Sequence, residues 1–126
     1  MNSNPVDSQR LFSRVPFHAQ VLLYLDDQPV QVTLLDIALK GALIQMASPV
    51  AVTLQSPCRL VLPLVEGGDV IEMRGHVVHL EELNVGVACQ DIDVLSLTQL
   101  RRLLELNTGD ADLMDRELSL LFAKHG

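Results

Sequence analysis

Two short polar motifs stand out because their residue types could together hold a phosphate-containing ligand with a guanine base. The first is R-L-F-S-R, from Arg10 to Arg14, and the second is D-I-A-L-K-G, from Asp36 to Gly41. A guanidinium donates to O6 and N7 of guanine together, stacks on purine faces and pairs with phosphate. The Asp36 carboxylate could accept from guanine N1–H and N2–H, or orient one of the arginines.

Each motif also has an ordinary structural explanation. Two arginines four residues apart can occur by chance on a solvated leader, and Asp36 could begin a turn by bonding nearby backbone. Gly41 would supply a backbone conformation closed to other residues, or let a ligand approach the main chain. Lys40 is more simply explained as a surface charge than as a phosphate contact. The motifs alone leave both interpretations open.

The size and charge of the chain limit the classes of function. A chain of 126 residues, 48% of them hydrophobic, fits one domain with its own core. The formal net charge is −7, with sixteen acids against nine bases, which argues against general affinity for DNA or RNA. Because twelve of the acids lie from Glu66 onward, a local anion site on the N-terminal side remains compatible with this charge.

Targeting and metal-binding signals are missing from the sequence. The start is polar, unlike a signal peptide, and no apolar run is long enough to cross a bilayer. We therefore expect a cytoplasmic protein without membrane insertion. Cys58 and Cys89 have no metal-ligand spacing, so we expect small buried side chains and no bound metal.

The hydrophobic pattern predicts a flexible leader, residues 1–14, followed by a mainly β domain, residues 15–126. Apolar and polar positions alternate with the period of a half-buried strand in six segments. The expected strands are about 15–25, 30–36, 41–47, 58–66, 70–80 and 85–90. Turn residues separate them, which favours an antiparallel barrel or sandwich.

A helical period replaces this alternation after Asp91, and we expect helices from about residue 93. Asn107-Thr108-Gly109 is a typical helix end, and Asp110 can cap a second helix. The apolar stripe of the first helix would be Leu97, Leu100, Leu103, Leu104 and Leu106. That of the second would be Met114, Leu118, Leu121 and Phe122.

The order and spacing of these features resemble the PilZ domain family, bacterial receptors for cyclic di-GMP. That family carries R-x-x-x-R ahead of its first strand and [D/N]-x-S-x-x-G at the junction of strands two and three. Arg10 and Arg14 match the first motif, and Asp36 and Gly41 match the second. The segment N-V-G-V-A-C-Q, from Asn84 to Gln90, also fits. The resemblance implies a six-stranded antiparallel, split-barrel-like β-barrel with C-terminal helices.

Three positions need separate comment in the site that this resemblance implies, because two depart from the family pattern and one is an additional candidate contact. Ala38 stands where the family usually has serine, and the lost hydrogen bond would weaken binding by about ten- to a hundredfold. Gln9 stands where many members carry a further basic residue. His79 lies where some members place an aromatic that stacks on guanine, although an ordinary histidine at the barrel rim explains it equally well.

The resemblance implies a receptor that binds cyclic di-GMP reversibly, as one nucleotide or as an intercalated dimer. The leader would fold over the barrel, and an unidentified downstream protein would respond to the change. Outputs of the family include motility, biofilm formation and exopolysaccharide control. We expect a monomer with no cofactor. We also expect no enzymatic activity, because the sequence has no nucleophile elbow, phosphate loop or H-E-x-x-H.

One alternative stays open within the same family. Degenerate PilZ proteins bind no nucleotide and act only through protein contacts, for instance in type IV pilus assembly. Such members typically lack the arginines that this chain retains, and the Ala38 departure keeps the alternative open.

Overall fold

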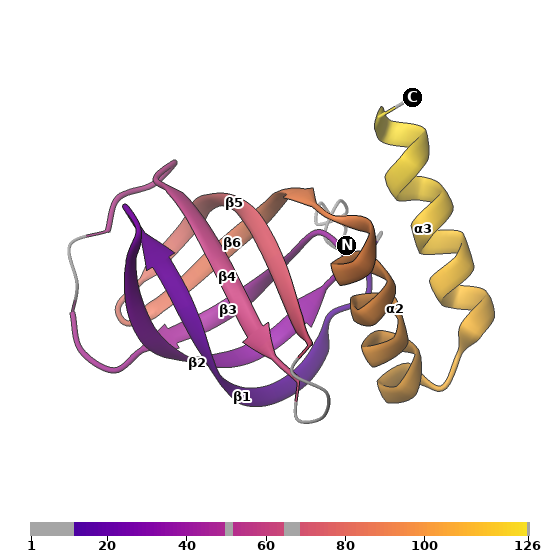
Figure 1. The fold of residues 1–126 in the computed structure, drawn as a ribbon, viewed down its shortest axis with the longest axis horizontal. Helices are drawn as coiled ribbons and strands as arrows, with labels where there is room; N and C mark the ends of the chain where they lie inside the picture. The colour runs from indigo at the N-terminus through magenta and orange to yellow at the C-terminus, as the bar shows by residue number, and fades with distance from the viewer. Residues whose placement is uncertain (1–11, 50–51, 65–68, 126) are drawn as a thin grey trace, which may run out of the picture.

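The chain forms a closed six-stranded antiparallel barrel followed by two helices (Figure 1). The structure, a computed structural model, describes residues 12–49, 52–64 and 69–125, and of 122–125 only the main chain. The strands are β1 (Val15–Leu25), β2 (Gln28–Ala38), β3 (Gly41–Met46), β4 (Pro57–Pro63), β5 (Val70–Glu81) and β6 (Asn84–Ile92). This confirms the mainly β fold with C-terminal helices.

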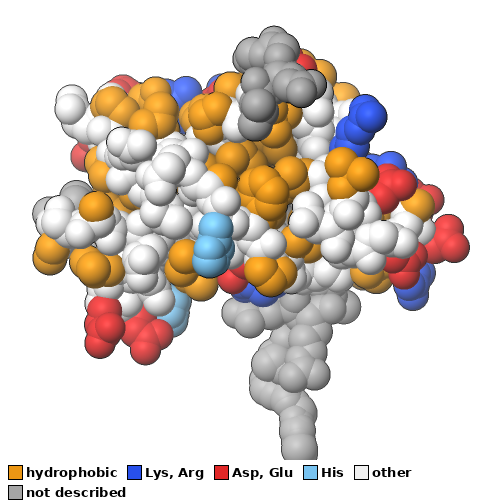
Figure 2. Space-filling model, turned by 90° about the horizontal axis from the view of Figure 1, so that it is seen from below, with side chains coloured by type: hydrophobic (Ala, Val, Ile, Leu, Met, Phe, Trp, Pro, Cys, Tyr) orange, Lys and Arg blue, Asp and Glu red, His pale blue; other side chains and the backbone are white. Residues whose placement is uncertain are grey.

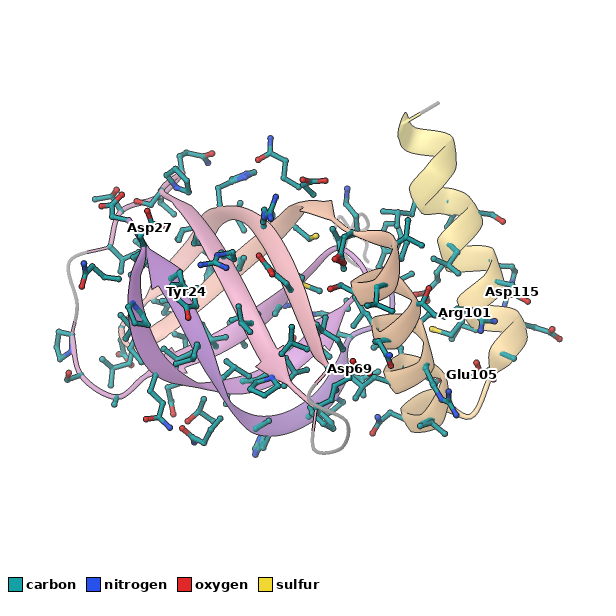
Figure 3. The ribbon with its side chains drawn as sticks, in the orientation of Figure 1. Tyr24, Asp27, Asp69, Arg101, Glu105 and Asp115 are labelled. Atoms are coloured by element: carbon teal, nitrogen blue, oxygen red, sulfur yellow. The ribbon has the colours of Figure 1, made fainter. Side chains whose placement is uncertain are left out.

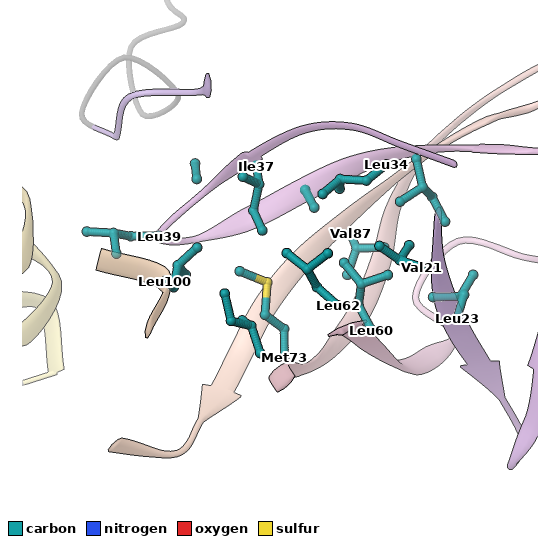
Figure 4. Packing of buried hydrophobic residues seen from close by; sticks show 14 of the residues in the cluster. Val21, Leu23, Leu34, Ile37, Leu39, Leu60, Leu62, Met73, Val87 and Leu100 are labelled. Carbon is teal, nitrogen blue, oxygen red and sulfur yellow. The ribbon is translucent and has the colours of Figure 1, made fainter. Parts of the chain in front are cut away.

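The strand order around the barrel is β1-β2-β3-β6-β5-β4, and β4 closes the ring by pairing with β1. Alternate side chains of each strand fill the interior, as the period of two predicts. On β5, Ile71, Met73 and Val77 are each no more than 1% exposed, which confirms the predicted inner face. Figure 4 shows this packed interior, which continues to Leu39 and Leu100 at one end of the barrel.

Three strands lose the simple alternation near one region of the barrel. The pairing register shifts between Pro16 and Ala19 on β1, and between Leu34 and Asp36 on β2. Another shift separates Val77 from His79 on β5. A bulge of this kind adds an unpaired residue, so the residues beyond it change face.

Helix α2 (Val94–Thr108) covers one end of the barrel (Figure 1). Leu100 and Leu104 are fully buried there, and Ser96 Oγ accepts a hydrogen bond from the backbone N–H of Glu72 at 3.0 Å. Asp93 caps the helix at its start, and hydrogen bonds from Ser96 lower the pKa of this carboxyl. Gly109 ends the helix with φ 70°, as the sequence predicted.

Helix α3 (Ala111–His125) lies on the outer side of α2 (Figure 1). The predicted Asp110 cap is confirmed, since its Oδ1 accepts from the backbone N–H of Leu113 at 3.0 Å. Arg101 of α2 donates to Asp115 of α3 at 2.6 Å (Figure 3). One predicted core position is wrong: Leu106 is 77% exposed, because it points away from the barrel end that the helix covers. Within the described residues, neither helix is long and apolar enough to cross a membrane.

Candidate functional site

A groove of about 610 Å³ opens beside the bulged strands, between the start of β1 and the strands β3, β5 and β6. Its size is in the range typical of small-molecule sites. The lining residues are Phe12, Arg14, Ala38, Lys40, Gly41, Ala42, Leu43, Val78, His79, Gly86, Val87 and Ala88. Five of the residues predicted from the sequence therefore lie on one groove: Arg14, Ala38, Lys40, Gly41 and His79.

Arg14 and Asp36 form an ion pair at the edge of this groove. The Nε–H of Arg14 donates to Oδ1 of Asp36 at 3.1 Å. The two residues meet because Arg14 comes just before β1, whose Pro16 pairs with Asp36 of β2. In the described part of the chain, the terminal nitrogens of the Arg14 guanidinium have no partner, so they can donate to a base edge or a phosphate.

The bulge on β2 decides where the Asp36 side chain points. Asp36 comes two residues after Leu34, which is fully buried, so strict alternation would direct the Asp36 side chain into the core. The register shift between the two residues turns Asp36 outward and places Ile37, 1% exposed, in the core instead. An interior carboxylate without partners would be costly, whereas the bulge lets this one meet Arg14.

The β2–β3 hairpin presents the second motif at the groove. Ala38 pairs with Gly41 across the two-residue turn formed by Leu39 and Lys40. The carbonyl of Lys40 accepts from the backbone N–H of Cys89 at 2.7 Å, which fixes the hairpin to β6. Ala38 is 6% exposed, so its methyl lies just under the groove surface.

Gly41 is required by close packing between strands. A Cβ at this position would lie 2.2 Å from the carbonyl oxygen of Val87 on β6. The φ of Gly41 is outside the left-handed region, so the special backbone conformation that the sequence suggested is not the reason for glycine here. A ligand contact at Gly41 stays a prediction.

His79 lies outside the barrel because of the bulge on β5. His79 comes two residues after buried Val77, so alternation would point its side chain inward, yet this side chain is 55% exposed. Its Nε2 lies 3.4 Å from Oε1 of Glu81. It pairs with Gly86, where a Cβ would lie 2.8 Å from the Cβ of His79. Gly86 thus gives the imidazole room beside the groove, a role that the sequence analysis missed.

Two of the predicted site residues cannot be placed, and two residues of the groove were not predicted. Gln9 and Arg10 lie outside the described residues. Phe12, only 5% exposed, and Val78, 45% exposed, add apolar surface to the groove but were not predicted. Phe12 had a signal in the sequence, because it is an apolar residue between the two arginines of the first motif.

Basic side chains and possible metal ligands are scattered over the described surface. On the face in Figure 2, Lys and Arg side chains do not form one continuous basic surface. No group of three or more His, Cys, Asp or Glu among the described residues is placed to hold a metal ion. Cys58 and Cys89 are free thiols, and burial raises the pKa of each to about 11.

The sequence matches the PilZ domain over residues 8–106, most of the chain. A barrel of this topology, with an arginine before its first strand and the aspartate–glycine hairpin beside it, defines the same class of protein. The chain belongs to the PilZ domain family.

Three solved structures with the same fold are similar to this chain. The PilZ domain of CeSA from a cellulose-synthesizing bacterium superposes with a TM-score of 0.58 at 15% identity, covering 77% of this chain and 96% of that one. The Bacillus subtilis inhibitor of motility, MotI/DgrA, gives 0.60 at 17% identity, covering 75% and 50%. Escherichia coli YcgR, solved in complex with c-di-GMP, gives 0.54 at 14% identity, covering 91% and 50%. This chain therefore matches half the length of the latter two proteins.

Proposed function

We propose that this protein is a receptor for cyclic di-GMP and binds the nucleotide in the groove beside Arg14. The ion pair between Arg14 and Asp36 carries the proposal, because Arg14 lines the groove and its terminal nitrogens have no partner among the described residues. These nitrogens would engage a guanine edge or a phosphate. Asp36 would hold the arginine or accept from the base. A protein with the same fold, YcgR, was solved in complex with c-di-GMP.

The remaining groove residues suit a base and a sugar–phosphate ring. Val78 and Phe12 add apolar surface to the groove, and the His79 ring offers a face on which a base could stack, which on aromatic side chains is worth about 1–3 kcal/mol for each base. The backbone at Gly41 has no side chain, and Lys40 adds a positive charge nearby. Ala38 supplies no hydroxyl, so we expect weaker binding than a serine would give.

In the proposed mechanism, nucleotide binding changes the conformation of the leader. A partner protein would then respond to the altered surface, with motility, biofilm formation or exopolysaccharide synthesis as the controlled process. Residues before Phe12 would contribute through Arg10 and Gln9. Ordering such a segment costs conformational entropy that the nucleotide contacts must exceed.

Isothermal titration with cyclic di-GMP tests this proposal on the wild type, Arg14→Ala and Ala38→Ser. We expect micromolar or tighter binding by the wild type and at least a hundredfold loss for Arg14→Ala, about 3 kcal/mol of charge-assisted contacts. Ala38→Ser should bind about tenfold more tightly. A stoichiometry near one or near two distinguishes a single nucleotide from an intercalated pair.

The matched control is Arg102→Ala, which removes an exposed arginine on α2, away from the groove. Its affinity should equal that of the wild type. Unchanged affinity in Arg14→Ala would remove the proposed mechanism. No heat and no thermal shift for the wild type would favour the alternative, a PilZ protein that acts only through protein contacts.

A further inference from the structure

A buried carboxylate on α3 holds the end of the leader. Glu117 is only 3% exposed. Its Oε2 accepts two hydrogen bonds from Ser13, one from the backbone N–H at 3.0 Å and one from the hydroxyl at 2.6 Å. These contacts join parts of the chain that are 104 residues apart. Buried carboxylates are costly unless such donors are supplied.

The second oxygen of Glu117 shows that helix packing alone does not explain this residue. Oε1 is buried and has no hydrogen-bond partner in the described part of the chain. An apolar side chain at this position would fill the buried space without that penalty, although it would leave the Ser13 N–H without its acceptor. The carboxylate therefore has a cost to the fold, and the contact with Ser13 is the one thing it gains in the described structure.

The neighbours of Ser13 connect this contact to the groove. Phe12 and Arg14 both line the groove, whereas Ser13 between them is turned toward α3. Holding Ser13 from the α3 side thus keeps its two neighbours on the groove side. The other restraint on Arg14, its ion pair with Asp36, is partly exposed, with 40% of the arginine side chain accessible, and such pairs are weak restraints.

We propose that Glu117 is a positioning residue for nucleotide binding, acting through Ser13 on Arg14. It fixes the end of the leader before the ligand arrives, which reduces the ordering cost that binding must overcome. This inference rests on the proposed function. It adds α3 to the binding machinery, although none of the described side chains of this helix lines the groove.

The test compares Glu117→Met, which keeps the side-chain length but removes the acceptor, with Glu117→Gln, which keeps an acceptor oxygen. Cyclic di-GMP affinity should fall about tenfold in Glu117→Met and stay within about threefold in Glu117→Gln. Without nucleotide, the Ser13 amide should exchange with solvent faster in Glu117→Met than in the wild type, because its acceptor is gone. Unchanged affinity with a wild type that binds would overturn only this inference.

Two further variants separate positioning from general packing. Met114→Ala removes a fully buried side chain from the same helix and keeps the Glu117 carboxylate that accepts from Ser13, so it should lower the melting temperature and leave the affinity unchanged. An equal loss of affinity in Met114→Ala and Glu117→Met would overturn the proposal. Ser13→Ala removes one donor, and we expect a loss of about threefold that does not add to the Glu117→Met effect. Additive losses would contradict the assigned route, and no binding by the wild type would overturn both proposals.

Discussion

The two sides of the groove are held in different ways. On the barrel side, Gly41 pairs with Ala88 inside a closed ring of strands and faces the Val87 carbonyl too closely for any side chain. On the leader side, Arg14 precedes the first strand and is held by side-chain contacts, its own with Asp36 and that of Ser13 with Glu117.

This difference separates stability from affinity. The hydrogen bonds between barrel strands are lost only when the barrel opens, so a change on the barrel side acts on folding. The partly exposed ion pair of Arg14 with Asp36 contributes little to folding, so we expect a change there to act mainly on nucleotide affinity. If the groove binds cyclic di-GMP as proposed, substitutions at the leader would change the affinity while the barrel stays intact.

The largest expected effect is on the barrel side. Gly41→Ala should lower the free energy of unfolding by about 3 kcal/mol, because a Cβ would lie 2.2 Å from the Val87 carbonyl oxygen and the strands must separate. Urea unfolding followed by circular dichroism measures this change. The control is Gly109→Ala, where no atom lies within 4 Å and only φ 70° opposes a side chain, at a cost of about 1 kcal/mol. Equal losses would mean that close packing does not fix Gly41.

A smaller effect on folding is expected where the two sides meet. Asp36→Asn keeps the shape but removes the charge opposite Arg14, so nucleotide affinity should fall about tenfold while the free energy of unfolding changes by less than about 1 kcal/mol. Titration and urea unfolding on the same sample measure both. Glu72→Gln is the control, because Glu72 contacts Arg59 and Arg74 instead of the groove. A stability loss as large as that of Gly41→Ala would show that the ion pair of Arg14 with Asp36 also holds the barrel together.

A third prediction concerns the thiols of Cys58, which is buried, and Cys89, which is partly buried, and it tests the rigidity of the barrel. Burial raises the pKa of Cys58 and Cys89 from 9.0 to about 11. The folded protein therefore holds the thiol protons more tightly than the unfolded chain does. The resulting contribution to the free energy of unfolding is complete below pH 9 and is lost as the pH rises through 11. The urea midpoint should fall over this range, and less so in a Cys58→Ala, Cys89→Ala double variant.

Thiol modification provides a direct check on the same residues. At pH 8 we expect slow reaction of the folded protein with a disulfide reagent and fast reaction in urea. Cys89 reports on the groove itself, since its backbone N–H holds the Lys40 carbonyl of the hairpin. Fast modification of Cys58, which is only 8% exposed, in the folded protein would show that the barrel opens readily.

Local patterns were sufficient to predict the elements and much of the core. Alternation placed Val21 and Leu23 inside β1, and the turn chemistry of Gly109 and Asp110 placed the boundary between the helices. The two polar motifs were enough to indicate the family, because their spacing on either side of the first strand depends only on the order of residues. Leu106 was misplaced because helical spacing alone does not say how much of a helix the barrel end can cover.

The exact faces of the site residues depended on contacts between distant segments. Strict alternation along the strands would point Asp36 and His79 into the barrel. The bulges against neighbouring strands turn both side chains outward. A bulge is set by how two strands pair, which no single segment records.

The sequence by itself determined the six strands, the two helices, their caps and the motifs that identify a PilZ domain. Only the tertiary structure decided that Gly41 is needed for strand packing, that Gly86 makes room for His79, and that Glu117 reaches Ser13. The physical reason is the range of the interactions. Propensity, alternation and capping act over a few residues, whereas the site is assembled by close approaches between segments that are brought together only when the barrel closes.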